Sequence, residues 1–136
     1  MKPAGQAKTS TPLMTAATVF VDAENLHRIR TSLADDGVEV IQMAELEEAI
    51  QSPVSVILLD ADCQPDWANA VRHVIEMRPT ARVVVLARKA DNRMWVETLS
   101  QGAYDLVLKP LLASEIRAAV LGPLQREMHM SAGVGL

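Results

Sequence analysis

Short apolar runs alternate with longer amphipathic stretches along this 136-residue chain. Continuous apolar runs of this length are typical of strands buried on both faces of a parallel sheet. They cover residues 18–22, 38–41, 54–60, 82–87 and 104–109. Apolar residues spaced three or four positions apart predict helices after each of these strands. These helices cover residues 24–36, 44–51, 66–77 and 91–101, and a last one begins near 114. Their side chains expected to face the core include Met77, Leu99 and Leu124, and Asp91 or Asn92 can cap the helix that ends at 101.

This alternation predicts an α/β fold, a doubly wound five-stranded parallel sheet with helices on both faces. Right-handed crossovers leave few topologies, and we expect the flavodoxin-like (βα)5 arrangement with strand order 2-1-3-4-5. The chain length suits one domain. We place it at residues 16–128, between a flexible N-terminal tail, 1–15, and a C-terminal tail, 129–136.

Three of the predicted strands end in charged residues. The first ends at Asp22, the third at Asp60 and the fifth at Lys109. Open α/β sheets bind their ligands at the carboxyl ends of the strands, where the strand order reverses. We therefore expect Asp22 and Asp60 on adjacent strand ends, with Lys109 across a pocket from them.

Composition narrows the class of protein. Hydrophobic residues make up 49% and aromatic residues only 3%, so the core must be aliphatic. The net charge of −4 argues against a general nucleic-acid surface. The single cysteine, Cys63, excludes an internal disulfide, and its acidic neighbours disfavour the thiolate. A reducing cytoplasm fits this cysteine content, and no apolar run approaches the length of a membrane span.

Four motifs in order resemble the receiver domain of bacterial two-component response regulators. The resemblance covers residues 17–121. It rests on Val21-Asp22-Ala23-Glu24, on Ile57-Leu58-Leu59-Asp60 followed by Pro65, on Gln101-Gly102-Ala103 and on Leu108-Lys109-Pro110. No single motif is specific, but all of them at the right strand ends are. The resemblance also implies a cis peptide bond between Lys109 and Pro110.

The resemblance implies a phosphoryl-transfer site. Asp60 would be the phosphoacceptor, a carboxylate nucleophile. The phosphoryl group would come from a sensor histidine kinase or a phosphotransfer protein. Lys109 would pair with the phosphate as a compact point charge. Mg²⁺, which prefers oxygen ligands, would be held by Asp22, Glu24, Asp60 and the backbone carbonyl of Asp62.

The sequence also departs from the receiver pattern. Ala23 stands where receivers carry a second metal-binding acid, and Ala87 where they carry a threonine or serine. Leu106 replaces the aromatic switch residue, and we expect Tyr104, on the same strand face, to replace it in part. Weaker metal binding and loss of the hydroxyl-to-aromatic switch should follow, so the site is partly degenerate.

Three functions remain open from the residues. The first is a phosphoacceptor domain. The second is a degenerate pseudo-receiver that binds proteins without phosphorylation, in which Lys109 only neutralises Asp22 and Asp60. The third is a small hydrolase with Asp60 as nucleophile and Asp62 as general acid or base. We favour a signalling module over an enzyme.

The expected partners are proteins. In receivers, the face made by the fourth helix, the fifth strand and the fifth helix contacts a downstream protein or a second copy. Here that face lies near Trp95, Tyr104 and Glu115. We expect no direct nucleic-acid partner and no membrane partner. The chain fits either a stand-alone receiver or a piece of a larger regulator.

Overall fold

The predicted sheet is present in the computed structural model, which describes residues 14–122. Five parallel strands lie in the order β2-β1-β3-β4-β5, which confirms the expected topology. The strands are β1 (Met14–Val19), β2 (Val38–Met43), β3 (Val56–Asp60), β4 (Arg82–Ala87) and β5 (Asp105–Leu108). The helices are α2 (Ala23–Ser32), α3 (Leu46–Gln51), α4 (Trp67–Met77) and α5 (Asn92–Ser100), and residues 113–122 are also helical.

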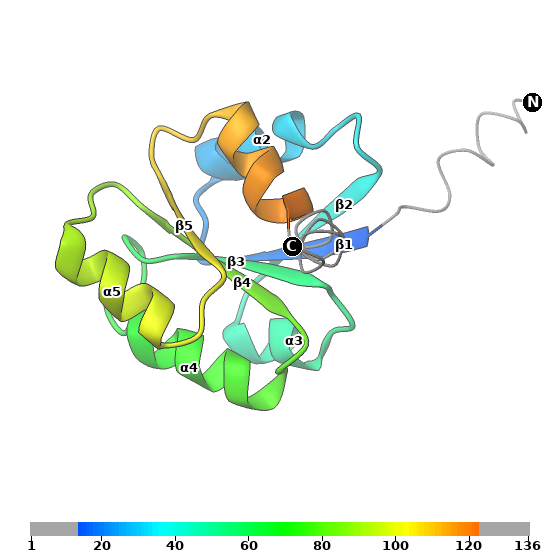
Figure 1. Cartoon of the computed structure of the whole chain (residues 1–136). Coiled ribbons are helices and arrows are strands. Elements are labelled where there is room, and N and C mark those ends of the chain that lie inside the picture. Colours follow the sequence, from blue (N-terminus) through cyan, green and yellow to red (C-terminus); the bar gives the residue numbers. More distant parts are fainter. Residues whose placement is uncertain (1–13, 123–136) are drawn as a thin grey trace, which may run out of the picture.

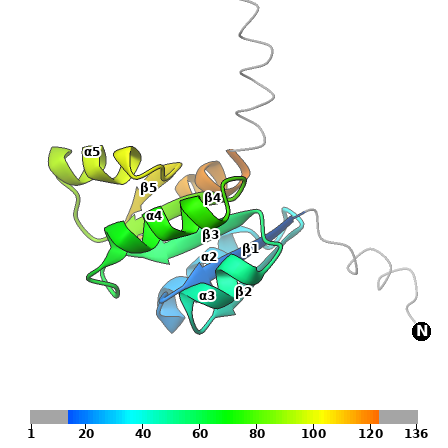
Figure 2. The same ribbon diagram turned by 90° about the horizontal axis from the view of Figure 1, so that it is seen from below.

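Helices cover both faces of the sheet (Figure 1). Helix α2 and the helical segment 113–122 pack on one face, and α3, α4 and α5 pack on the other. Seen from below, α4 lies over β3 and β4 (Figure 2). The apolar core therefore forms two layers, one on each side of the strands.

Strand β3 is the centre of both layers. It pairs with β1 on one side and β4 on the other, and all five of its residues are buried. Its side chains alternate, so that Leu58 joins the layer under α2 while Ile57 joins the layer under α4. A continuous apolar sequence is required here because neither face of this strand meets water.

Helix boundaries follow local hydrogen bonding. The Asp22 carboxylate accepts a hydrogen bond from the backbone N–H of Asn25 at 2.8 Å and caps α2. The predicted cap of α5 is also confirmed, since Asp91 accepts from the N–H of Met94 at 2.9 Å. Gly37, with a φ of 71°, makes the turn from α2 into β2.

Strand β1 lies earlier than we predicted. It begins at Met14 rather than Thr18, so residues 14 and 15 belong to the sheet and not to the N-terminal tail. It ends at Val19, and Phe20 has a φ of 65°, a left-handed turn that no sequence signal marks. Helix α2 is also shorter than the predicted 24–36, because it ends at Ser32.

Two helical side chains predicted to face the core are exposed. Met77 is the last residue of α4 and is exposed. Leu99 of α5 is 50% exposed, and its neighbour Thr98 is buried in its place. A helix rotates 100° per residue, so one position of error in phase exchanges a core residue for a surface one.

Some predictions concern residues outside the described part of the chain. These include Leu124 as a core residue, the C-terminal tail 129–136 and most of the N-terminal tail. Within residues 14–122, no helix is both long and apolar enough to cross a bilayer.

Two leucine substitutions test this assignment of the core. Leu58→Ala should lower the free energy of unfolding by about 2–5 kcal/mol, because it leaves a cavity in a fully buried strand. Leu99→Ala should change it by no more than about 0.5 kcal/mol, because its side chain faces solvent. Urea unfolding followed by circular dichroism measures both. Equal losses for the two variants would contradict the orientation of α5.

Candidate functional site

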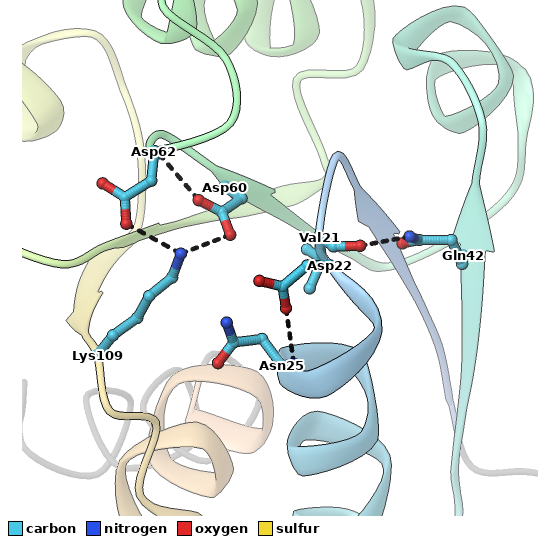
Figure 3. A network of polar contacts seen from close by, with 7 residues as sticks. All are labelled: Val21, Asp22, Asn25, Gln42, Asp60, Asp62 and Lys109. Atoms are coloured by element: carbon cyan, nitrogen blue, oxygen red, sulfur yellow. Dashed lines mark hydrogen bonds and ion pairs between the residues drawn. The ribbon is translucent and has the colours of Figure 1, made fainter.

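Three strand ends meet at the carboxyl edge of the sheet. Asp60 is the last residue of β3, and Lys109 follows β5 directly. Asp22 lies in the short connection between β1, the neighbour of β3, and α2. Figure 3 shows the three side chains pointing toward one another, as the strand order predicted.

The Asp60 carboxylate is fully buried and has both oxygens engaged. Its Oδ2 lies 2.7 Å from the Nζ of Lys109, in a charge-assisted hydrogen bond. Its Oδ1 accepts a hydrogen bond from the backbone N–H of Asp62 at 2.9 Å. Without such partners, burying this carboxylate would cost on the order of several kcal/mol of lost hydration.

Lys109 bridges two carboxylates. Its Nζ also donates to Oδ2 of Asp62 at 2.9 Å, and its side chain is only 10% exposed. Its backbone N–H donates to the carbonyl of Ala87 at the end of β4, at 2.8 Å, which fixes the start of the side chain. The peptide bond to Pro110 is cis, as the resemblance implied.

The bridge also determines how Lys109 titrates. Burial alone would lower the pKa of Lys109, but hydrogen bonds to Asp60 and Asp62, and the charges of both, raise it above the ordinary lysine value. The ammonium is therefore fully charged at neutral pH. Because the pKa of Lys109 is higher in the folded protein than in the unfolded one, the stabilisation of the fold by this ion pair is complete below the unfolded pKa. It is lost as the pH rises through the folded pKa.

Asp22 is held by the start of α2 and by the neighbouring strand. Its carboxylate caps the helix and faces the pair formed by Asp60 and Lys109 (Figure 3). The carbonyl of Val21, one residue earlier, accepts a hydrogen bond from Nε2 of Gln42 at 2.6 Å. Gln42 in β2 is opposite the buried Thr18, whose hydroxyl donates to its Oε1.

Sequence reasoning missed Gln42 as a site residue, and it missed the contact between the Asp62 carboxylate and Lys109. A polar residue in β2 facing a buried threonine is a signal for Gln42, but it is visible only once strand register is known. For Asp62 we expected a metal-binding backbone carbonyl or, in the hydrolase alternative, a side chain acting as general acid or base. The structure shows its side chain in contact with Lys109, and an acid two residues after Asp60 is the available signal.

The structure does not bring Glu24 to this group. Its side chain is 79% exposed on the surface of α2, where its carboxylate lies 3.8 Å from the guanidinium of Arg28, one turn along the helix. The acid next to the Ala23 position therefore faces solvent. In the described part of the chain, no three Asp, Glu, His or Cys side chains are clustered so that they could hold a metal ion.

Asp22 and Asp60 nevertheless fit a hard cation in part. Both present carboxylate oxygens at adjacent strand ends, and Mg²⁺ commonly takes one or two carboxylates together with phosphate and several waters. One oxygen of Asp22 is already committed to the α2 cap, and Asp60 to Lys109. The donor set therefore suits a weakly held divalent cation better than a tight one.

The positions that depart from the receiver pattern lie as expected at Ala87 and Leu106, but Tyr104 lies elsewhere. Ala87 ends β4, and Leu106 is buried in β5. Tyr104 precedes β5 and lies with its ring 6.0 Å from the guanidinium carbon of Arg82, the first residue of β4. That is the amino edge of the sheet, opposite Asp60, so Tyr104 does not take the place of the missing switch aromatic.

Cys63 lies in the turn that follows Asp60, and its electrostatic surroundings do not suit nucleophilic chemistry. Partial burial raises the pKa of its thiol, and the carboxylate of Asp60 raises it further, against a smaller lowering by Lys109. The thiolate, which is the reactive form of cysteine, is therefore scarce at neutral pH.

Known proteins share this architecture. A two-component response regulator from Clostridium difficile superposes with a TM-score of 0.73 at 19% identity, over 84% of this chain and 98% of that one. A response regulator protein from Burkholderia pseudomallei, solved with a phosphorylated aspartic acid, a calcium ion and citrate, superposes with a TM-score of 0.68 at 20% identity, over 87% of this chain and 74% of that one. The chain has the receiver-domain fold.

One curated protein also matches this chain in sequence. It is a protein-glutamate methylesterase/protein-glutamine glutaminase from Archaeoglobus fulgidus, 30% identical over 127 residues. The match covers 87% of this chain but only 36% of that protein, so the chain spans about a third of the length of this relative. No family model matches the chain.

Removing the lysine tests the buried pair. Lys109→Met should lower the free energy of unfolding by about 3–5 kcal/mol at pH 7, because it leaves the Asp60 carboxylate buried without its cation. The double variant Asp60→Asn with Lys109→Met should recover most of that loss. Chemical denaturation of the native chain, of the single variants Lys109→Met and Asp60→Asn, and of the double variant gives the coupling energy. Additive losses would contradict a coupled, buried ion pair.

Proposed function

We propose that this chain is a receiver domain of two-component phosphorelay signalling that accepts a phosphoryl group on Asp60. The observation that carries the proposal is the buried pair of Asp60 and Lys109 at the carboxyl edge of the sheet. A carboxylate at that position can act as a nucleophile, and the adjacent ammonium can meet the charge of the arriving phosphoryl oxygens.

The reaction is a direct displacement at phosphorus. One Asp60 oxygen forms the new O–P bond while the bond from phosphorus to the donor breaks, and the electron pair leaves with the donor. With acetyl phosphate the leaving group is acetate, which needs no proton. With a phosphohistidine the leaving group is the imidazole nitrogen, which ends neutral because its other nitrogen carries the proton.

This chain's own residues supply the charge balance. Lys109 is fully charged at neutral pH and contacts Asp60 before any transfer, so it needs little reorganisation. Asp22 would add a second oxygen ligand beside Asp60 for a divalent cation. Such a cation, when bound, neutralises charge that develops on the phosphoryl oxygens.

The comparisons support this proposal at the level of fold. The response regulator protein from Burkholderia pseudomallei carries a phosphorylated aspartic acid and a calcium ion on the same architecture. By analogy, we propose a histidine kinase or a phosphotransfer protein as the donor. We also propose that the output is a contact through α5, β5 and the segment 113–122, with a downstream protein or a second copy.

A pseudo-receiver is the second candidate, and a specific observation favours it. Lys109 is already paired with both Asp60 and Asp62 without any phosphate, and Ala23 and Ala87 lack the groups that receivers use for metal and phosphoryl contact. Under this alternative the chain binds proteins independently of phosphorylation. The hydrolase is less well supported, because the Asp62 carboxylate contacts Lys109 rather than standing free as a base.

Intact mass spectrometry separates the two candidates. Incubation with acetyl phosphate and Mg²⁺ should add one phosphoryl group to the native chain, and a chelator should prevent this. Asp60→Asn, which keeps the shape of the side chain without its nucleophilic charge, should give no adduct.

Asp105→Asn is the matched control, because Asp105 lies at the amino end of β5, far along the strand from Lys109. It should be modified like the native chain. If the native chain gains no adduct while its circular dichroism shows a folded protein, the phosphoacceptor function is excluded and the pseudo-receiver remains.

A further inference from the structure

We propose that the Asp62 carboxylate is a built-in competitor of the phosphoryl group for Lys109, and that it slows phosphorylation of Asp60. This inference rests on the proposed function. It assigns to Asp62 a positioning role, since the carboxylate acts through Lys109 and not on the reacting atoms.

The geometry supports a competition for one ammonium group. Lys109 has three N–H donors, of which one points to Asp60 and one to Asp62. Figure 3 shows its side chain reaching from the end of β5 to a point between these two carboxylates. A phosphoryl group on Asp60 would bring further anionic oxygens to the same ammonium, so it must share or displace the Asp62 contact.

Asp62 can be displaced without disturbing the fold. The Asp62 side chain is 30% exposed, whereas that of Asp60 is fully buried, so the Asp62 carboxylate can move into water at small cost. In the described part of the chain its only side-chain partner is Lys109. The backbone N–H of Asp62, which donates to Asp60, holds the turn and does not depend on the carboxylate.

The charge of Asp62 acts in the same direction as its contact with Lys109. An anion beside Asp60 repels the incoming phosphoryl donor, and it offsets part of the positive charge that would stabilise the transition state. Removing that charge should therefore speed transfer. It should do so even though Asp60 and Lys109 keep their own contact.

The test compares rates of adduct formation from acetyl phosphate in the full chain with Mg²⁺, followed by intact mass. Asp62→Asn should be modified faster than the native chain by a factor on the order of ten, the scale of one charge-assisted hydrogen bond. Asp62→Ser, which replaces the carboxylate with a smaller neutral group, should give a similar gain. It serves as the test variant if Asp62→Asn folds poorly. Asp62→Glu, which keeps the charge, should stay slow.

The charge control is Asp66→Asn. Asp66 lies four residues further on, and its carboxylate contacts Asn69 rather than Lys109. Its removal should change the rate by less than twofold. If Asp66→Asn speeds the reaction as much as Asp62→Asn, the effect is general electrostatics and the inference is overturned.

The remaining outcomes separate this inference from the proposed function. If the native chain and Asp62→Asn are modified at equal rates, Asp60 is an acceptor but Asp62 is not a competitor. If neither forms an adduct while both are folded, the proposed function fails and the inference falls with it. Modification of Asp62→Asn alone would support the competition at Lys109, but it would exclude the native chain as a phosphoacceptor.

Discussion

The buried Asp60 carboxylate needs a cation, and the rest of the carboxyl edge is arranged around this need. Asp60 lies at the end of the strand with the greatest burial, where an unpaired charge would be strongly unfavourable. Lys109 reaches it from across β4, at the end of β5. The pair therefore ties the central strand to the edge of the sheet, and it holds only when all of β3, β4 and β5 are in register.

The same pair links stability with function. A lysine that neutralises Asp60 in the resting protein is already in place to neutralise a phosphoryl group, so the structure is preorganised for transfer. The second carboxylate on Lys109, that of Asp62, is what distinguishes this site. With one cation and two acids, the empty site already carries one excess negative charge. Each further anion it accepts must compete for the same charge.

Much of the fold and part of the site follow from the sequence alone. Continuous apolar runs predict buried parallel strands, because a strand lacks the alternation of apolar and polar residues when both of its faces are covered. Right-handed crossovers then leave few strand orders, and the expected doubly wound order 2-1-3-4-5 brings Asp22, Asp60 and Lys109 together. The exposure of Leu99 was not predictable, because helical phase depends on which side the sheet lies. The positive φ of Phe20 has no sequence signal. The side-chain roles of Gln42 and Asp62 depend on register and on a turn that pattern does not reveal.

A crystal structure of the native chain with Mg²⁺ and saturating beryllium fluoride tests the central claim most directly. The account predicts a trifluoroberyllate group bound to one oxygen of Asp60, with the Nζ of Lys109 in contact with a fluorine. It also predicts that the Asp62 carboxylate has left Lys109 for solvent. Crystals in which Lys109 still bridges Asp60 and Asp62, with no fluoride species on Asp60, would contradict it.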